Sequence, residues 1–357
     1  MRGIVFLGDG ELELRDFDVP IPGQGEVLVE MKASGICGSD LNWLNREKKE
    51  IDELPHVNPM GHEPCGVIAA LGSGATGVEV GQRIMVYHYS GCGKCKYCRI
   101  GYEQLCIHGF DYYGTSRPRG FGGGHEDYMI VPDRVCMDLP DEMSFEAGAA
   151  VSCGTGSAYS ALKKVDASGH DTIAVFGQGP VGLSATMIGA ALGARVIAID
   201  KVPYRLELAK KLGAAEVVNA TDGDAVEAVK DLTNGEGAEV TLECTAHPSV
   251  RVQTVESAKL FGRACFLGEG GGVTFDDVSR QIMHKLLTIH GSWTFSTWML
   301  EEAAKWIADR NLPIEELITH RFPLEQAQEA YRVFQRGQTG KVVFVWKGEE
   351  NGTGSQW

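Results

Sequence analysis

The chain has 357 residues, of which 43% are hydrophobic, and a formal net charge of −15 at pH 7. This length and apolar content suffice for a large core, divided into about two domains. The acidic balance argues against nucleic acid as a partner, because phosphates require a basic surface. The sequence has neither a long apolar run typical of a membrane span nor a charged-then-apolar leader, so we expect a cytoplasmic protein with no membrane partner.

Residues 1–150 are rich in strand patterns and poor in helix patterns. Short apolar or alternating runs are separated by turns that contain Gly, Pro and Asp. This pattern predicts a mostly β domain. The runs cover residues 4–6, 11–15, 26–33, 66–71, 83–86 and 126–131.

Four cysteines in this region are spaced as metal ligands. Cys92, Cys95, Cys98 and Cys106 form a CxxCxxCx7C array on a loop rich in Lys, Tyr and Gly, at about residues 90–107. Four thiolates at this spacing can close a tetrahedron around one zinc ion, and a metal would order a loop that has little apolar content. The alternative is four reduced cysteines without a ligand. The spacing favours a structural zinc in a reducing compartment over disulfides.

A second candidate metal site is spread over three segments. Cys37 follows an early strand, His62 opens the next strand region, and Cys153 lies shortly before the glycine-rich motif described below. A single Cys or His is more often a core residue than a ligand. Together, however, one His and two Cys leave a fourth zinc position open for water or substrate, as a catalytic site requires.

Residues 171–200 carry the motif around which the rest of the chain is organised. A buried-strand pattern at 172–176 precedes a GxGxxG motif, an apolar helix at about 181–192 and a second strand at 195–199. In a dinucleotide fingerprint, Gly177 permits the tight turn, Gly179 lets the backbone approach a pyrophosphate, and Gly182 lets helix and strand pack closely. Pro180 and Val181 open the helix, whose N-terminus faces the phosphates. A chance match is the alternative, but strand, helix and second strand are all in register.

Asp200 ends the second strand, 18 residues after Gly182. A carboxylate here can accept both hydroxyls of an adenosine ribose and repel a 2′-phosphate, which predicts NAD rather than NADP. Lys201 and Arg205 are close enough in sequence to reach a 2′-phosphate, so strict selectivity does not follow. We count Arg205 among the cofactor-binding candidates.

Strands and helices alternate after Asp200, which predicts a parallel, doubly wound α/β sheet. The chain then returns to the first domain with a helix at 297–309 and a strand at 341–346, so we expect a nucleotide domain at 155–292 inserted in a catalytic domain made of 1–154 and 293–357. Residues 348–357 are expected to be frayed. The intervening helices are expected at 204–212, 225–232 and 249–260, and the strands at 216–219, 239–243, 263–267 and 287–290.

The ordered set of motifs resembles the zinc-dependent medium-chain alcohol and polyol dehydrogenase family. The set comprises Cys37 with Ser39-Asp40, the Gly61-His62-Glu63 triplet, the four-cysteine lobe, Cys153 and the fingerprint. The resemblance covers essentially the whole chain. It implies a Rossmann domain inserted in a GroES-like catalytic domain, and a homodimer or homotetramer.

The resemblance also implies a role for each site residue. Cys37, His62 and Cys153 match the catalytic-zinc ligands, and the four-cysteine lobe matches the structural-zinc site, so two zinc ions per chain are expected. Asp40 matches the acid that orients the histidine, Ser39 the hydroxyl that takes the substrate proton, and Glu63 a carboxylate that can approach the metal. Val181 matches the residue behind the nicotinamide, and Lys341 falls near a basic residue that reaches the pyrophosphate.

Three positions depart from the best-known members. Asn42 stands where many carry the histidine that ends the proton relay, and Gly38 stands where some carry an arginine on the pyrophosphate. Sorbitol-type members more often have a glutamate near Cys153, which weakens a pure polyol assignment. The proton exit and one phosphate contact therefore stay open.

The implied function is hydride transfer between NAD and the CH–OH group of a small molecule, giving a ketone or aldehyde in a cleft between the domains. An alcohol, a sugar or polyol, and an amino alcohol all fit the sequence as substrates. Trp43, Tyr113, Trp293 and Phe295 are candidates for the pocket wall, although aromatic residues are more often core. The alternative function is a zinc- and nucleotide-binding redox sensor without turnover, which would not need Ser39, Asp40 and Glu63 around an open metal site.

Overall fold

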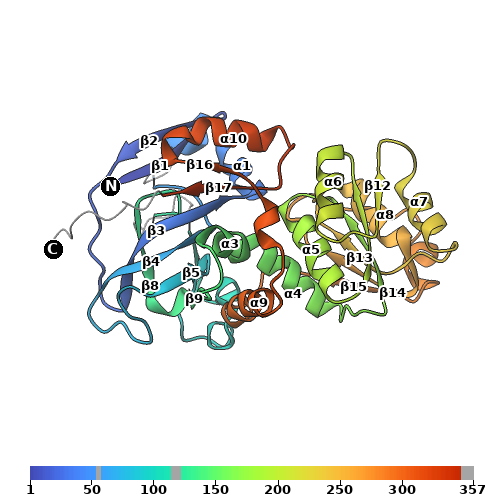
Figure 1. The fold of residues 1–357 in the computed structure, drawn as a ribbon, viewed down its shortest axis with the longest axis horizontal. Helices are drawn as coiled ribbons and strands as arrows, with labels where there is room; N and C mark the ends of the chain where they lie inside the picture. Colours follow the sequence, from blue (N-terminus) through green and yellow to red (C-terminus); the bar gives the residue numbers. More distant parts are fainter. Residues whose placement is uncertain (54–57, 114–121, 347–357) are drawn as a thin grey trace.

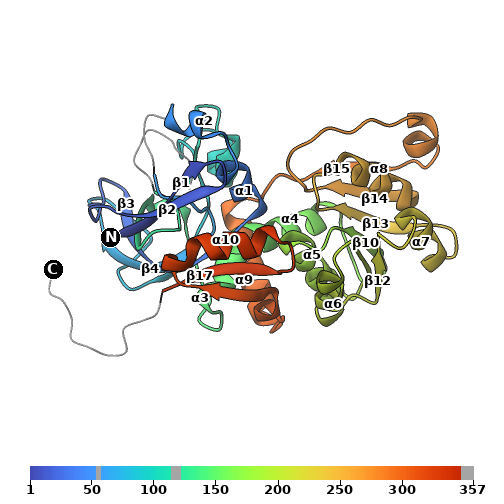
Figure 2. The same ribbon diagram turned by 90° about the horizontal axis from the view of Figure 1, so that it is seen from above.

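A computed structural model describes residues 1–53, 58–113 and 122–346. Figures 1 and 2 show two bodies side by side along the long axis of the molecule, each built around one large sheet. The first sheet has the order β16-β17-β3-β4-β5-β9, with β8 also paired to β3. Its strands are β3 (Glu26–Ile36), β4 (Pro64–Leu71), β5 (Arg83–Val86), β8 (Tyr128–Pro132), β9 (Cys136–Asp138), β16 (Ile318–Phe322) and β17 (Lys341–Val345).

Two small antiparallel sheets complete the first body. β1 (Arg2–Gly8) pairs with β2 (Glu11–Asp16), and β6 (Tyr89–Ser90) pairs with β7 (Asp111–Tyr112). The β6–β7 pair joins the two ends of the four-cysteine loop. The predicted mostly β character of this region is confirmed. The ends of the predicted strands differ from the observed ones by a few residues at most, and β6, β7 and β9 were not predicted.

The second sheet is parallel throughout and has six strands in the order β12-β11-β10-β13-β14-β15. The strands are β10 (Thr172–Phe176), β11 (Arg195–Asp200), β12 (Glu216–Asn219), β13 (Ala238–Glu243), β14 (Ala258–Phe266) and β15 (Thr288–Gly291). The order reverses between β10 and β13, the point at which open α/β sheets bind ligands beyond the carboxyl ends of their strands. This confirms the predicted doubly wound sheet.

Four helices connect these strands. They are α5 (Pro180–Ala191), α6 (Pro203–Lys211), α7 (Ala225–Leu232) and α8 (Pro248–Ser257). Proline occupies the first turn of α5, α6 and α8, where no helical N–H partner is lost, and the Asp224 carboxylate caps α7 by accepting from the N–H groups of Val226 and Glu227. The prediction of a helix up to residue 260 was wrong at its end, because the apolar run that begins at Ala258 pairs with β13 as a strand.

The first body and the connecting region contain helices that the sequence patterns did not predict. These are α1 (Gly38–Leu44), α2 (Lys48–Asp52), α3 (Phe145–Ala150), α4 (Gly156–Lys164) and α10 (Ala327–Gln335); α9 (Thr297–Asp309) matches its prediction. A π-helical turn, Val151–Thr155, joins α3 to α4. The Ala- and Gly-rich stretch of α3 is buried on nearly every side, so it has no amphipathic period from which a helix could be predicted. The predicted frayed tail lies outside the described residues.

Candidate active site and metal centres

Three segments of the first body bring together the proposed ligands of the open metal site. Cys37 directly follows β3 and begins α1, His62 and Glu63 directly precede β4, and Cys153 lies on the π-helical turn. Their ligand atoms all lie within 4.8 Å of one another, so the predicted set of Cys37, His62 and Cys153 converges, with Glu63 beside it. A glycine must precede His62, because Gly61 has φ +93° and a Cβ there would lie 2.3 Å from the ring of His125.

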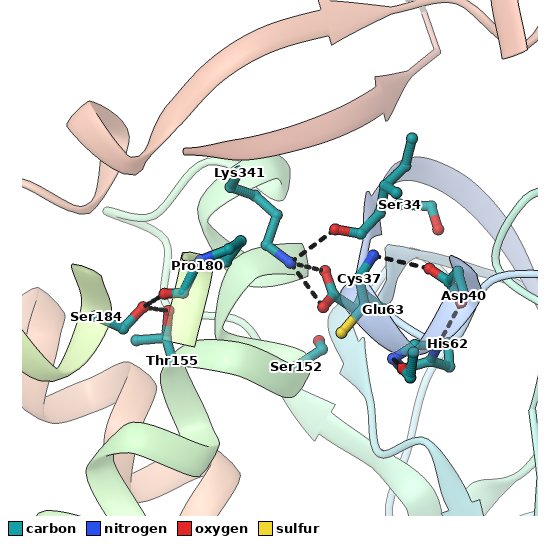
Figure 3. Close-up of polar contacts among 12 residues, drawn as sticks. Ser34, Cys37, Asp40, His62, Glu63, Ser152, Thr155, Pro180, Ser184 and Lys341 are labelled. Carbon is teal, nitrogen blue, oxygen red and sulfur yellow. Dashed lines mark hydrogen bonds and ion pairs between the residues drawn. The ribbon is translucent and has the colours of Figure 1, made fainter. Parts of the chain in front are cut away.

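Asp40 orients the histidine of this set (Figure 3). Its Oδ1 lies 2.8 Å from His62 Nδ1, and its Oδ2 accepts a 2.8 Å hydrogen bond from the Cys37 N–H. Because a carboxylate can only accept, Nδ1 of His62 carries the proton and Nε2 is the ring atom left for a metal. Burial disfavours the imidazolium, but the charges of Asp40 and Cys37 outweigh it and raise the pKa of His62. Ser39 Oγ lies 3.3 Å from His62 Nε2.

The two cysteines of this set affect each other's ionisation. A hydrogen bond with Cys153 lowers the pKa of the Cys37 thiol well below its ordinary value, and the same contact raises the pKa of Cys153. Two sulfurs and one imidazole nitrogen, with one sulfur already favouring the thiolate, suit zinc and leave one coordination position open.

Lys341 forms a buried ion pair with Glu63. Its Nζ is 2.7 Å from Glu63 Oε1 and donates to the Ile36 carbonyl oxygen at 3.2 Å, and both charged side chains are almost fully buried. The resemblance placed Lys341 near the pyrophosphate of the cofactor, whereas in this structure its ammonium is directed into the metal site (Figure 3). Burial, only partly offset by Lys341, raises the pKa of Glu63 to about 7.

The four-cysteine lobe brings its sulfurs together. Cys95 Sγ lies 3.4 Å from Cys98 Sγ and 3.9 Å from Cys106 Sγ, and the sulfurs of Cys92 and Cys98 are 4.0 Å apart. A zinc tetrahedron with bonds of about 2.3 Å separates its sulfurs by roughly 3.8 Å. Backbone hydrogen bonds lower the pKa of Cys95 to about 6, which favours the thiolate that a metal requires. The lobe therefore fits a zinc ion with four protein ligands.

The fingerprint loop has the close approaches that require glycine. Gly177 has φ +91°, and a Cβ on Gly182 would lie 1.7 Å from the Gly177 carbonyl oxygen. Gly179 is the N-cap of α5, with Pro180 and Val181 in its first turn. The N-terminus of α5 and its neighbouring backbone are thus positioned at the carboxyl edge of the parallel sheet, as phosphate binding requires.

Asp200 ends β11 beside this loop. Its carboxylate accepts from the N–H groups of Gln178, at 2.5 Å, and Val202, at 2.9 Å. Arg205, on α6, donates to the Thr339 carbonyl oxygen at 3.2 Å, and burial lowers its pKa. Arg205 therefore links the second sheet to the segment that leads into β17.

The fingerprint helix contacts the turn that carries Cys153. A Cβ on Gly154 would lie 3.6 Å from Val181 Cγ2, and Thr155 Oγ1 is 2.8 Å from Ser184 Oγ (Figure 3). The Ser184 hydroxyl also lies 2.7 Å from the Pro180 carbonyl oxygen, which it can reach as a donor. The open metal set and the nucleotide fingerprint are therefore neighbours, joined by one turn of π-helix and the first turns of α5.

Sequence reasoning missed the aromatic residues next to His62. The His62 ring centroid lies 5.6 Å from that of His88 and 5.1 Å from that of Tyr112, and Tyr89 packs against both. His88 Nδ1 donates to the Ser152 carbonyl oxygen at 2.8 Å. The Tyr-His-Tyr run just before the first lobe cysteine was the available signal.

The four pocket candidates from the sequence are placed differently from one another. Phe295 and Tyr113 are fully buried core residues. Trp293 is 40% exposed and packs on Tyr89, whereas the indole of Trp43 stacks under the Arg46 guanidinium. Among the positions that depart from the family pattern, Asn42 is exposed, and a side chain at Gly38 would meet no atom within 4 Å. In the described ranges, no helix is long and apolar enough to cross a membrane.

Comparison with known proteins identifies the family. Residues 23–141 match the family model of the alcohol dehydrogenase GroES-like domain, and residues 180–309 match that of the zinc-binding dehydrogenase. A zinc-type alcohol dehydrogenase-like protein of Escherichia coli K12, YphC, is 39% identical over 346 residues, which cover 94% of this chain and 96% of the relative. The chain belongs to the zinc-dependent medium-chain dehydrogenase family.

Relatives and solved structures agree over nearly the whole length of this dehydrogenase. The L-threonine 3-dehydrogenase of Bacillus subtilis is 33% identical and is aligned over 92% of this chain and 94% of its own. Alcohol dehydrogenase TADH from Thermus sp. ATN1 superposes with a TM-score of 0.85 at 28% identity, over 97% of this chain and 99% of that one. Galactitol-1-phosphate dehydrogenase from Escherichia coli also superposes with a TM-score of 0.85 at 28% identity, over 97% of this chain and 100% of that one.

The family membership establishes the fold and the reaction type. The fold combines a GroES-like part with a parallel Rossmann sheet, and the protein is an oxidoreductase that acts at a CH–OH group. The four-cysteine cluster, together with the structure of the rspB alcohol dehydrogenase from Escherichia coli CFT073 in complex with NADH, supports zinc and NAD(H) as cofactors. The rspB structure superposes with a TM-score of 0.85 at 26% identity, over 97% of this chain and 99% of that one.

Proposed function

We propose that the protein is a zinc- and NAD-dependent dehydrogenase of polar alcohols, with Cys37, His62 and Cys153 as ligands of a catalytic zinc. The observation that carries this proposal is the contact of the Cys153 turn with the first turn of α5, at Val181. It brings an open Cys-His-Cys set next to the fingerprint, as transfer between a metal-held substrate and a nicotinamide requires. The metal set has three ligands and an open fourth position. A redox sensor without turnover needs no open position, so the set favours an enzyme.

The chemistry divides between the cofactors and the side chains. Zinc, when bound, supplies a Lewis acid for the oxygen of the alcohol or carbonyl, and NAD supplies the hydride acceptor. Asp40 fixes the His62 ring through the Nδ1 hydrogen bond, so that Nε2 faces the metal set. Ser39, 3.3 Å from that Nε2, is placed to receive the proton of the substrate hydroxyl, and Glu63 lies close enough to exchange with a ligand. Asn42 cannot accept that proton, so solvent or the cofactor ribose completes the relay.

The four-cysteine lobe would hold a second zinc with a structural role, giving two zinc ions per chain. Two features support this division: the lobe offers four sulfurs and no open position, and the β6–β7 pair closes its base. The lobe leaves Ile100, Leu105 and Ile107 exposed rather than packed in a core, so a metal would contribute directly to its stability.

Asp200 would select NAD over NADP. Its carboxylate stands at the end of β11, where an added 2′-phosphate would meet negative charge. Lys201 is exposed, and Arg205 is held against the segment before β17. Gly177, Gly179, Pro180, Val181 and Gly182 form the rest of the cofactor site. A contact of Lys341 with the pyrophosphate would require that its ion pair with Glu63 opens.

The residues beside His62 favour a substrate with a further polar group. Because His88 Nδ1 donates to the Ser152 carbonyl oxygen, a neutral His88 has its lone pair on Nε2, and within the described segments no hydrogen bond reaches that atom. A second hydroxyl or an ammonium group on the substrate would supply the missing donor. This supports a sugar, polyol or amino alcohol over a simple aliphatic alcohol.

The remaining proposals concern organisation. We place the nucleotide domain at 155–292 and the catalytic domain at 1–154 and 293–357, and we expect a cytoplasmic homodimer or homotetramer. In Figure 1, α4 and α9 lie between the two sheets, close to where the chain enters and leaves the second body, which supports these domain limits.

Reduction of NAD at 340 nm with a panel of alcohols, polyols, sugars and amino alcohols tests the proposed function. We expect turnover with at least one alcohol that carries a second polar group, and weaker turnover with the corresponding mono-alcohol. A fully zinc-loaded protein that binds NADH but turns over no member of the panel in either direction would contradict the proposal.

A further inference from the structure

Three loops meet at the carboxyl edge of the parallel sheet, and a single arginine holds one of them. The loops follow β10, β13 and β14. A Cβ on Gly177 would lie 2.4 Å from Thr245 Cγ2, and a Cβ on Gly268 would lie 2.1 Å from the Ala246 nitrogen. The fingerprint loop therefore packs on the β13 loop, which in turn packs on the glycine-rich loop Gly268–Gly272 after β14.

Arg251, on α8, forms hydrogen bonds with the backbone of the glycine-rich loop. Its guanidinium donates to four carbonyl oxygens, those of Gly268 at 2.8 Å, Gly270 at 2.5 Å, Gly271 at 2.7 Å and Gly272 at 3.2 Å. The arginine is 8% exposed, whereas Glu269 and the glycines from 270 to 272 are exposed. A loop with four glycines in five residues has high conformational entropy, so these bonds account for its order.

Glu243 connects the arginine to the neighbouring loop. Its side chain is fully buried at the end of β13, and Oε1 accepts from the Thr245 hydroxyl at 2.6 Å and the Ala246 N–H at 2.7 Å. Oε2 lies 3.6 Å from Arg251 Nε, and neither of these two atoms has a hydrogen-bond partner among the described residues. One ion pair therefore sets the relative positions of the β13 and β14 loops.

The position of these loops relative to the cofactor follows from the strand order. A dinucleotide lies across the switch point between β10 and β13, with its two halves over opposite sides of the sheet. Asp200 assigns the adenosine half to β11, so the nicotinamide half lies over β13 and β14. This assignment rests on the proposed use of NAD.

We propose that Arg251 is a positioning residue for the nicotinamide half of the cofactor. By holding four carbonyl groups of the Gly268–Gly272 loop, it orders the loop before the cofactor binds, so that the cost of ordering is not subtracted from the binding free energy. The adenosine half binds over β11 and does not depend on this loop. Loss of Arg251 should therefore weaken the binding of NADH much more than that of ADP-ribose, which lacks the nicotinamide.

Titration calorimetry with NADH and ADP-ribose on the zinc-loaded protein tests this. For Arg251→Met we expect Kd for NADH to rise about tenfold or more, with Kd for ADP-ribose changed by about twofold or less. Arg251→Lys keeps the charge opposite Glu243 but loses the forked set of guanidinium donors. It should raise Kd for NADH relative to Kd for ADP-ribose by a smaller factor than Arg251→Met does. Arg251→Lys also carries the test if Arg251→Met fails to fold.

Arg263 provides a matched control within the same sheet. It pairs with Asp171 and donates at 2.7 Å to the carbonyl oxygens of Val165 and Asp166, near the amino end of β10. Arg263→Met should lower thermal stability without changing the ratio of the two dissociation constants. Equal weakening of both ligands in the Arg251 variants, or no change in either, would overturn the inference. A native protein that binds ADP-ribose but not NADH would also overturn it, whereas one that binds neither ligand would refute the proposed use of NAD itself.

Discussion

Lys341 Nζ lies 2.7 Å from Glu63 Oε1, across 278 residues of sequence, and both side chains are buried beside the open metal set. The pairing of β17 with β3 produces this contact, because Val342 stands opposite Ile36 and places Lys341 over the end of the strand that leads to Cys37. A buried charge without its partner is costly, so neither group can be removed alone without loss of stability.

Lys341→Met should lower the free energy of unfolding by up to about 3–5 kcal/mol, because Glu63 loses its counter-charge and must either stay charged without a partner or take up a proton. Adding Glu63→Gln should recover much of this loss, and urea denaturation of the single and double variants measures both. Arg332→Met, at an exposed ion pair with Glu329, is the control and should cost about 1 kcal/mol or less. If Lys341→Met leaves stability unchanged and only weakens NADH binding, the Lys341 ammonium binds the cofactor pyrophosphate instead of stabilising Glu63.

The sequence predicted much of the metal chemistry but not this ion pair. Cys37, His62 and Cys153 could be grouped because their order and residue types match an open zinc site, and the structure brings them within 4.8 Å. The contact of Lys341 with Glu63 depends on the register of two distant strands, which no local pattern specifies. His88 escaped prediction for the same reason, since its ring meets His62 only through tertiary packing.

The parallel sheet was the most predictable part of the fold. Its central strands, β10, β11 and β13, are buried apolar runs, and β10, β12 and α7 match their predicted limits. The π-helical turn at Cys153 was not predictable, because its five residues, VSCGT, are too few to show a hydrophobic period. That turn nevertheless connects the metal set to the fingerprint.

The two metal sites should be separable by mutation. Cys37→Ala should remove about one zinc per chain and leave the fold intact, because the open set lies on elements that are already held by sheet pairing. Cys95→Ala should lower thermal stability, because its lobe depends on the metal for order. Elemental analysis and thermal denaturation of both variants provide the test, with Cys136→Ala as a buried cysteine outside both sets. Loss of both metals and of folding in Cys37→Ala would contradict the division.

Asp200→Ser should relax the preference for NAD. The native protein is expected to favour NAD over NADP by at least tenfold in kcat/KM, about 1.4 kcal/mol. Removing the carboxylate removes its repulsion of a 2′-phosphate, although the bonds to the Gln178 and Val202 N–H groups are also lost. Asp222→Ser, on the exposed turn after β12, controls for the loss of one negative charge near this edge. Equal use of both cofactors by the native protein would refute the role of Asp200.

Ser39→Ala should lower kcat by about a hundredfold or more, because general acid–base catalysis is typically worth roughly 10² to 10⁴-fold. Ser39 Oγ lies 3.3 Å from His62 Nε2, whereas Asn42 is exposed and has no group that titrates near neutral pH. Asn42→Ala is therefore the matched control and should have a much smaller effect. Steady-state rates of both variants between about pH 6 and 10 test this role. A near-native kcat of Ser39→Ala at every pH would show that Ser39 has only a structural role in the first turn of α1.

His125 should make stability depend on pH below neutrality. The ring is fully buried, with Nδ1 2.9 Å from Ser34 Oγ and Nε2 2.8 Å from the Tyr331 hydroxyl. Burial lowers the pKa of His125 to about 4 in the folded state, against 6.5 for a free histidine. Between these values the unfolded chain binds a proton that the native state does not, so stability rises with pH in this window and falls as the solution is acidified.

Substitution separates the contribution of His125 from that of other titrating groups, such as His88, whose pKa burial also lowers, to about 3. One such histidine contributes a slope of up to about 1.4 kcal/mol per pH unit between about pH 4 and 6.5, and the slope vanishes above the unfolded pKa. His125→Gln keeps hydrogen-bonding atoms for Ser34 and Tyr331 but cannot titrate, so its unfolding free energy should vary less steeply with pH than that of the native protein. His284→Gln, at an exposed position, should leave the native slope unchanged. Urea denaturation from pH 4.5 to 7.5 compares the three proteins, and parallel curves for the native protein and His125→Gln would mean that the buried ring does not titrate in this range.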